Sequence, residues 1–318
     1  MGNKKSTLRF QKKSKKDEAP SVVSSQSTTQ SMSRVMHGRE FHNVESSTYV
    51  LPKDDFEKDR LHQQHFVVKE QLKGNILNKE MMTPLFEKGI YALDVGCGPG
   101  SWVLDMATDF PNSEFEGMDM ADTFPTAIHP PNAHFCKGNL LEPLTYDRPF
   151  DFVQMRQVFN SIFFALGLRK QEWAITYKNI HAALKNGGYF QHVETTGQPE
   201  TTDPTIKRVF EALASIQRQR GQEPTICAQL RPLAEETGFE IVHDFTYVVE
   251  AGWGSRADQL MADTIGTAIQ GLAPFLAKEM GVDDHTGRKL VDQAIANFAP
   301  SKSVFHIHCF LARKTSSI

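Results

Sequence analysis

An acidic residue followed by three evenly spaced glycines is the part of this chain best suited to chemistry. Asp94 lies in an apolar run from Ile90 to Val95, and glycines stand at positions 96, 98 and 100. Glycine lets the backbone turn sharply, and it lets a ligand approach amide groups that a Cβ atom would shield. A strand, a glycine turn and the start of a helix, in this order, predict a nucleotide-binding crevice.

Two features indicate what kind of ligand this turn would bind. A dinucleotide site would have its third glycine at position 101, where this chain has Ser101. We expect Ser101 to cap the helix that follows. An acid two residues before the first glycine also suits a cation better than a pyrophosphate, so the pattern favours a positively charged ligand.

Polar residues at the ends of the next two strand-like segments could complete a nucleoside site. Asp119 could accept both hydroxyls of a ribose, and Met120 could pack on the face of an adenine. The side chain of Asn139 could bond the exocyclic amine of that adenine while the backbone amide of Leu140 bonds a ring nitrogen. A surface acid and a turn asparagine are the structural alternatives.

The motif Asp94-x-Gly96-x-Gly98-x-Gly100 resembles the first motif of class I S-adenosylmethionine (SAM) methyltransferases, whose cofactor carries an ammonium group and a sulfonium. Over about residues 45–195 the chain more closely resembles the fungal SAM methyltransferases related to the global regulator of secondary metabolism. The segments that carry this closer resemblance are Tyr49–Pro52, Asp54–Asp55, Glu57, Asp59–Leu61, Gln64–His65, Trp102, Phe110–Pro111, Pro130–Asn132, Phe150–Val153, Arg156, Gly187–Tyr189 and Glu194.

The resemblance implies SAM as the cofactor and a defined set of residues to bind it. Arg156 and Gln157 join this set because they lie at the carboxyl end of the fourth strand-like segment, which faces the reaction centre in such folds. The predicted cofactor-binding residues are Asp94, Gly96, Cys97, Gly98, Gly100, Asp119, Met120, Asn139, Leu140, Arg156 and Gln157. No metal site is expected, since the four cysteines are scattered without a Cys-x-x-Cys pair.

Candidate bases are harder to choose. Methyl transfer from a sulfonium is an in-line displacement, in which alignment supplies much of the rate. A general base is needed only when the acceptor is a hydroxyl or an activated carbon that must lose a proton. His192 and Glu194, near the end of the fifth strand-like segment, are the predicted catalytic residues, with His62 and His65 as alternatives. Each of these side chains could equally have a structural role.

Alternating strand-like and helical segments predict an α/β fold with a doubly wound parallel sheet. The resemblance implies the seven-stranded, Rossmann-like class I sheet, with a sixth strand followed by an antiparallel seventh. Helices are predicted at about 54–72, 101–109, 169–185, 203–220 and 225–237, with Asn186–Gly188 as a C-cap of the third. Strands are predicted at 90–95, 114–118, 133–137, 150–155, 189–194, 239–250 and 303–312.

The chain is expected to divide into a tail and one folded domain. Residues 1–36 are basic and then rich in Ser, Thr and Gln, which predicts disorder. Residues 37–318 form the predicted methyltransferase domain, with a SAM-binding core at about 88–195 and helical insertions at about 200–237 and 255–298. With 318 residues and 40% hydrophobic content, the chain can bury a full core.

The first residues could be an address. Met1-Gly2-Asn3-Lys4-Lys5-Ser6 fits the pattern for N-myristoylation of Gly2. A single acyl chain binds bilayers only marginally, and the seven basic residues in positions 1–16 could supply the second signal on an anionic membrane surface. This predicts a cytoplasmic protein with possible membrane association. A nuclear localisation signal at Lys12–Lys16 and a solubilising tail without an address are the alternatives.

Composition restricts the partners. The net charge is −3 although the tail is strongly basic, so the folded body is acidic and nucleic acid is not expected as its partner. The apolar residues of the helical insertions favour a small organic acceptor, as the resemblance does. The sequence therefore predicts a SAM-dependent methyltransferase of an unidentified small acceptor. A non-catalytic or weakly catalytic SAM-binding regulator and a protein methyltransferase are the alternatives.

Overall fold

The computed structural model describes residues 33–36, 39–42, 55–125, 127–158 and 168–315. The Gly2 motif and the basic run at residues 12–16 lie outside the described residues. Near the predicted end of the tail, β1 (Ser33–Met36) pairs in antiparallel register with β2 (Arg39–His42). No helix in the described ranges is long and apolar enough to cross a bilayer.

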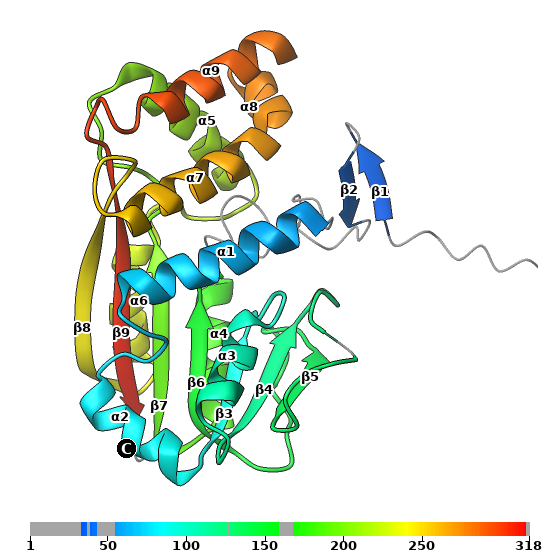
Figure 1. Ribbon diagram of the computed structural model, residues 1–318, viewed down its shortest axis with the longest axis vertical. Helices are drawn as coiled ribbons and strands as arrows, with labels where there is room; N and C mark the ends of the chain where they lie inside the picture. Colours follow the sequence, from blue (N-terminus) through cyan, green and yellow to red (C-terminus); the bar gives the residue numbers. More distant parts are fainter. Residues whose placement is uncertain (1–32, 37–38, 43–54, 126, 159–167, 316–318) are drawn as a thin grey trace, which may run out of the picture. The chain divides into compact units, whose positions relative to one another are not determined.

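A seven-stranded sheet is the centre of the unit that spans residues 32–318 (Figure 1). Its order is β5-β4-β3-β6-β7-β9-β8, and β9 runs antiparallel to both of its neighbours. This is the class I sheet with the antiparallel last strand, so the predicted fold is confirmed. The strands are β3 (Tyr91–Val95), β4 (Glu114–Asp119), β5 (Ala133–Lys137), β6 (Phe150–Arg156), β7 (Leu184–Thr195), β8 (Phe239–Glu250) and β9 (Val304–Lys314).

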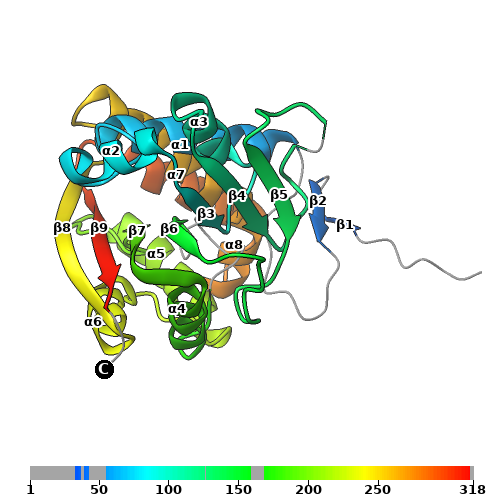
Figure 2. The same cartoon turned by 90° about the horizontal axis from the view of Figure 1, so that it is seen from below.

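Helices cover both faces of the sheet. Figure 2 shows α1, α2 and α3 on one face, and α4 and α6 on the other. The helices α5, α7, α8 and α9 pack on one another beyond the carboxyl ends of the parallel strands (Figure 1). Their bounds are α1 (Asp55–Gln71), α2 (Lys79–Lys88), α3 (Ser101–Asp109), α4 (Glu172–Ala183), α5 (Pro204–Gln219), α6 (Cys227–Glu236), α7 (Arg256–Gly271), α8 (Ala273–Glu279) and α9 (Asp284–Ala296).

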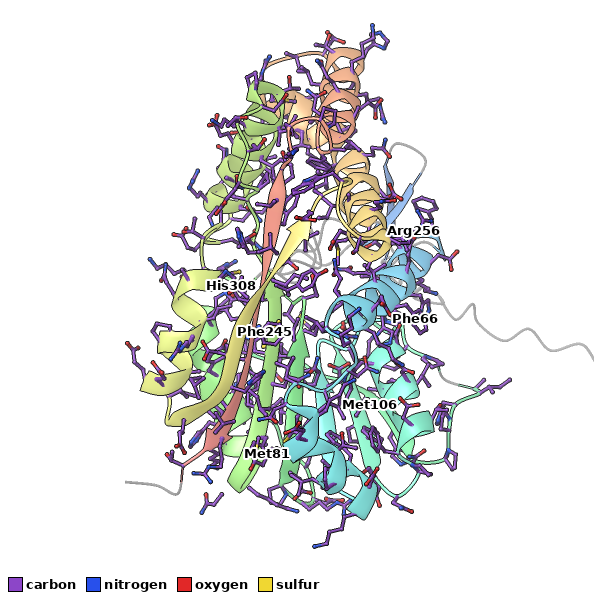
Figure 3. The ribbon with its side chains drawn as sticks, turned by 60° about the vertical axis from the view of Figure 1, so that its left-hand side comes forward. Phe66, Met81, Met106, Phe245, Arg256 and His308 are labelled. Carbon is purple, nitrogen blue, oxygen red and sulfur yellow. The ribbon has the colours of Figure 1, made fainter. Side chains whose placement is uncertain are left out.

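The central strand β3 is buried along its whole length, as is typical of a parallel strand covered on both sides. Successive side chains of a strand point to opposite faces. Ala92 therefore joins the apolar cluster on the α1–α3 face, and Leu93 joins the cluster under α4. Met106 of α3 and Phe245 of β8, both labelled in Figure 3, belong to the first of these clusters. The alternation at Asp94 thus sends its side chain toward the α1–α3 face.

Two predicted boundaries are wrong. Helix α4 ends at Ala183 rather than at 185, because Leu184 is already extended, buried and paired with Phe150 of β6. The predicted C-cap therefore lies inside β7, where the pairing register shifts and Gly187 takes a φ of 76°. The sequence also does not predict α2, which contains Pro84, a residue that disfavours helix interiors.

Candidate functional site

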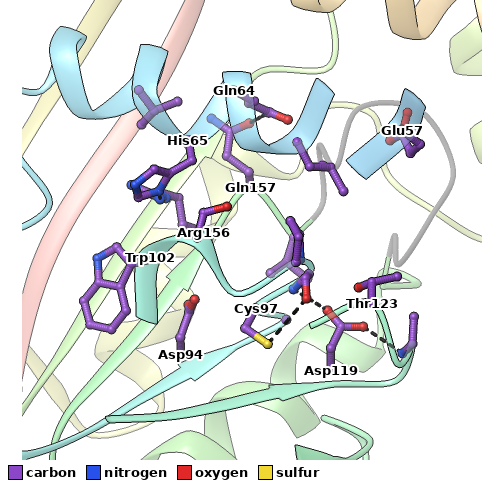
Figure 4. A pocket seen from close by; sticks show the side chains of 18 residues that line it. Glu57, Gln64, His65, Asp94, Cys97, Trp102, Asp119, Thr123, Arg156 and Gln157 are labelled. Atoms are coloured by element: carbon purple, nitrogen blue, oxygen red, sulfur yellow. Dashed lines mark hydrogen bonds between the residues drawn. The ribbon is translucent and has the colours of Figure 1, made fainter. Parts of the chain in front are cut away.

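A cleft opens at the carboxyl ends of β3, β4 and β6, beneath α1 (Figure 4). Ligands of open α/β sheets bind at this edge. Five of its lining residues come from α1, and the others come from the glycine turn and from the strand ends. The cleft is lined by Glu57, Leu61, Gln64, His65, Val68, Asp94, Gly96, Cys97, Gly98, Pro99, Ser101, Trp102, Asp119, Ala121, Thr123, Arg156, Gln157 and Val158.

The three glycines of the turn have different roles. All have positive φ, at 72°, 54° and 79° for Gly96, Gly98 and Gly100. A Cβ atom at Gly100 would lie 2.5 Å from the Phe135 ring, and one at Gly96 would lie 2.9 Å from Val158. At Gly98 the nearest atom would be a Leu61 methyl at 4.0 Å. Packing therefore requires the outer glycines, whereas Gly98 leaves its backbone open to the cleft.

Ser101 is not the helix cap that the sequence predicts. Gly100 occupies the N-cap position in a left-handed conformation, and no side chain caps α3. Ser101 is the first residue of the helix, and its hydroxyl forms a 2.8 Å hydrogen bond with Nδ1 of His62 on α1. The first N–H groups of α3 thus remain available at the cleft, and they favour a negatively charged or hydrogen-bond-accepting ligand group.

Asp94 is a buried acid with an open carboxylate. Its side chain lines the cleft with an exposed fraction of 5%, and no described residue donates a hydrogen bond to it. Burial raises its pKa to about 7, an effect that Arg156 opposes and Asp119 reinforces. A buried carboxylate without a hydrogen-bond donor is costly, so this position fits a ligand that brings a positive charge.

Asp119 joins the glycine turn to the end of β4. One carboxylate oxygen accepts a hydrogen bond from the Gly98 N–H at 2.8 Å, and the other accepts one from the Ala121 N–H at 2.9 Å. Burial raises the pKa of this carboxyl as well. A carboxylate has about four acceptor positions, so Asp119 can hold the turn in shape and still accept ribose hydroxyls.

Gln157 connects the sheet edge to α1 and has a φ of 61°, a rare backbone conformation for a residue other than glycine. Its Nε2 donates to Thr195 Oγ1 at 2.8 Å, and its Oε1 accepts from Gln64 Nε2 at 2.9 Å. Gln64 in turn accepts a hydrogen bond from Arg60, which is paired with Glu57. Strained backbone of this kind is found at functional sites, and here it directs a side chain into the cleft wall.

Three of the predicted adenine-side residues do not line the cleft. The side chain of Met120 is 46% exposed, and Leu140 packs in the cluster under α4. The side-chain oxygen Oδ1 of Asn139 accepts a hydrogen bond from the Leu141 N–H at 3.0 Å, which is the turn geometry of the structural alternative. Gly100 is also outside the cleft lining. The other predicted cofactor-binding residues are all brought together in it.

His192 and Glu194 lie on the opposite face of the sheet, away from the cleft lining. The Tyr177 hydroxyl is 2.6 Å from Nδ1 of His192, whose ring packs against Trp173 and Phe310. Helices cover both faces of β7, and His192, Val193 and Glu194 are all buried. A catalytic role for His192 and Glu194 stays a prediction that the cleft geometry does not support.

The alternative bases are on α1. His62 bonds Ser101 as described above. His65 lines the cleft, but Asp105 and Arg156 occupy both of its ring nitrogens. His62 is not among the residues that line the cleft, and His65 has no free ring nitrogen to accept a proton. His65 is therefore better explained as a residue that positions others.

Sequence reasoning missed several residues of the lining. Glu57, Leu61, Gln64 and Val68 recur at three- and four-residue steps on α1 and share one helix face. That spacing, with polar residues on a face that also holds apolar ones, is the signal that could have identified them. Among the residues described, no group of three His, Cys, Asp or Glu side chains is placed to hold a metal ion.

Comparison with known proteins identifies the region that contains the turn. A family model described as a methyltransferase domain matches residues 92–188. The secondary metabolism regulator LAE1 of Cochliobolus heterostrophus is 30% identical over 54% of this chain and 53% of its own. The methyltransferase pytC of Aspergillus terreus is 25% identical over 74% of this chain and 72% of its own. The match thus spans only about half the length of the regulator.

Among solved structures, a putative sarcosine dimethylglycine methyltransferase from Galdieria sulphuraria aligns with a TM-score of 0.46 at 14% identity. The alignment covers 88% of this chain and 96% of that one. The fold described above rests on the strand order and register of this chain's own sheet.

Proposed function

Because the chain belongs to the class I SAM-dependent methyltransferases, we propose that it transfers the methyl group of SAM to a small organic acceptor. The open, buried carboxylate of Asp94 is the observation that carries this proposal. It fits the ammonium group of SAM, and the exposed backbone at Gly98 fits close approach of the ligand. Bound SAM supplies an electrophilic methyl group on its sulfonium.

The cleft residues bind and align rather than remove protons. Glu57 is held in a bidentate pair with Arg60, and both ring nitrogens of His65 are occupied. Alignment alone can supply a large part of the rate of a displacement. The described cleft therefore favours an acceptor whose nucleophilic atom already has an available lone pair, such as an amine or a thiolate.

The position of helix α1 over the cleft supports a small acceptor. Helix α1 crosses the carboxyl ends of the strands and contributes five lining residues. Gln64 and His65 fasten it to β6 and α3 through side-chain hydrogen bonds. A helix held in this way narrows the approach to the cleft, which suits a compact molecule better than a folded protein surface.

A regulatory SAM-binding protein is the second candidate. It is supported by the relative whose name describes a regulator of secondary metabolism. It is also compatible with a cleft in which Asp94 and Asp119 are assigned to SAM, Glu57 is paired with Arg60, and both ring nitrogens of His65 are occupied. Such a protein would bind SAM and transfer little methyl.

Incubation with methyl-labelled SAM separates these candidates. The purified protein and host extract are mixed beside an Asp94→Ala control, and label is measured in organic-soluble and protein-bound fractions. Label in the organic fraction that depends on Asp94 supports the proposal. Label on protein instead would replace the small acceptor with a protein substrate. No label above the control, with SAM binding intact, would favour the regulator.

A further inference from the structure

Arg156 is a partly buried cation whose side chain lines the cleft near Asp94 (Figure 4). Its Nη1 donates to Asn75 Oδ1 at 3.5 Å, and its Nη2 donates to Nδ1 of His65. A guanidinium carries five N–H donors, so three of them form no hydrogen bond with the residues that the structure describes. Asp94 interacts with Arg156 electrostatically but forms no hydrogen bond with it. The cleft therefore has an unsaturated donor group beside an unsaturated carboxylate.

The contact with Arg156 fixes the protonation of His65. An arginine cannot accept a hydrogen bond, so Nδ1 of His65 must be the acceptor. The proton of the neutral ring is then on Nε2, which donates to Asp105 Oδ2 at 3.0 Å. Burial and the charge of Arg156 lower the pKa of His65 to about 4, so the ring stays neutral at pH 7.

Asn75 closes the arrangement into a ring of hydrogen bonds. Its Nδ2 donates to the same Asp105 oxygen at 2.6 Å, while its Oδ1 accepts from Arg156. Arg156, His65, Asp105 and Asn75 thus restrain one another, and Lys69 adds a 2.7 Å bond to Asp105. The four side chains come from β6, α1, α3 and the loop after α1. The ring holds the guanidinium in one orientation.

We propose that Arg156, oriented by His65, binds the α-carboxylate of the methionine part of SAM while Asp94 binds its ammonium group. An α-amino acid carries these two charges on one carbon, so a guanidinium and a carboxylate that line the same cleft complement it. His65 is a positioning residue, since it acts through Arg156. The assignment deepens the proposed function, because it rests on SAM as the ligand of this cleft.

The test compares SAM with its decarboxylated analogue, which keeps the sulfonium and the amine but lacks the α-carboxylate. Isothermal titration calorimetry gives the affinity for each. The wild-type protein is expected to prefer SAM by about tenfold to hundredfold, the range of a hydrogen-bonded charge pair. Arg156→Gln should reduce the preference to about threefold or less. Equal binding of the two ligands by the wild type would by itself overturn the proposal.

The role of His65 is tested with two substitutions. His65→Leu removes both ring hydrogen bonds and should lower the carboxylate preference by about tenfold. His65→Gln can still accept from Arg156 and donate to Asp105, so it should keep most of the preference. Gln63→Ala, on the exposed face of the same helix, is the matched control and should match the wild type. An unchanged preference in a folded His65→Leu variant would refute the positioning role.

Binding and transfer have separate outcomes. A protein that prefers SAM over the decarboxylated analogue but transfers no methyl would contradict the proposed function and support the carboxylate assignment. A folded Arg156→Gln variant with the full wild-type preference would overturn the assignment even if methyl transfer is observed. Arg156→Lys, which keeps the charge but loses the planar pair of donors, provides a second variant and should retain only part of the preference.

Discussion

At the scale of single residues, Asp94 makes ligand binding sensitive to pH. Its pKa is raised to about 7, so near neutrality the free protein is a mixture of protonated and ionised forms. A cationic ligand binds protein in which Asp94 is ionised. Its binding to protein in which Asp94 is protonated therefore releases that proton. Affinity should therefore rise with pH up to about 7 and then level off. The same raised pKa lowers the stability of the folded state as pH rises from about 4 to about 7, and above pH 7 the loss stays constant because Asp94 is then ionised in both states.

The first prediction follows from that titration. The affinity for S-adenosylhomocysteine, whose amine is cationic in this range, should rise about tenfold between pH 6 and pH 8, as the ionised fraction of a group with a pKa of about 7 does. Calorimetry in two buffers of different ionisation enthalpy measures both the affinity and the proton released. Asp94→Asn should bind weakly with no such dependence. A wild-type affinity that is flat over this range would contradict the prediction.

The glycine turn gives a second prediction at this scale, because its members face different surroundings. Gly98→Ala should cost about 1 kcal/mol of folding free energy for its left-handed backbone and greatly weaken SAM binding, since the new methyl group points into the cleft. Gly100→Ala has the same backbone cost and adds a clash with the Phe135 ring, for a total of about 2–4 kcal/mol. Urea denaturation and ligand titration distinguish the two. Equal losses of stability would count against the assigned roles.

At the scale of elements, α1 is the part that completes the cleft. Gln64 fastens it to β6, His65 fastens it to α3, and Gln71 at its end donates to Asp258 of α7 at 2.9 Å. Asp258 is buried, accepts from the Tyr247 hydroxyl and forms the capping box of α7 with Ser255. The position of the helix over the cofactor site thus depends on the insertion that follows the sixth strand.

Asp258→Ala tests this dependence. The substitution removes a helix-capping residue and leaves two donors without their acceptor, the buried Gln71 amide and the partly buried Tyr247 hydroxyl, so we expect a loss of about 2–4 kcal/mol in the free energy of unfolding. SAM affinity should fall as well, because α1 lines the cleft. Asp263→Ala, exposed on the same helix, should change stability by less than about 0.5 kcal/mol. Chemical denaturation measures both variants, and similar losses would refute the role of Asp258.

For the molecule as a whole, residues 32–318 form one compact unit. A chain that starts at Met32 should therefore unfold within about 2 °C of the full chain and bind S-adenosylhomocysteine equally well. The seven basic residues it lacks should make anionic vesicles retain only the full chain at low salt. Thermal unfolding measures the first effect, and sedimentation with vesicles measures the second. A large drop in Tm would show that the first 31 residues belong to the fold.

Features that depend on local pattern are predictable from the amino-acid sequence. The alternation of apolar runs and helical segments predicts the parallel sheet, and the spacing of Asp94 and the glycines predicts the ligand turn. These features are readable because each is set by residues within a few positions of one another. The end of α4 and the start of β7 differ from the prediction. Leu184 pairs with Phe150, which is far away in the chain, and this pairing outweighs the local glycine signal.

Which side chains share the cleft depends on long-range packing and cannot be read from local pattern. His65 and Arg156 are 91 positions apart, and their contact exists because α1 crosses the end of β6. The same is true of Gln64 and Gln157, which are 93 positions apart. His192 and Glu194 carry suitable chemistry in the right strand, but the alternation of β7 points them to the other face. Residue type and spacing select candidates for chemistry, and long-range packing determines which of them meet.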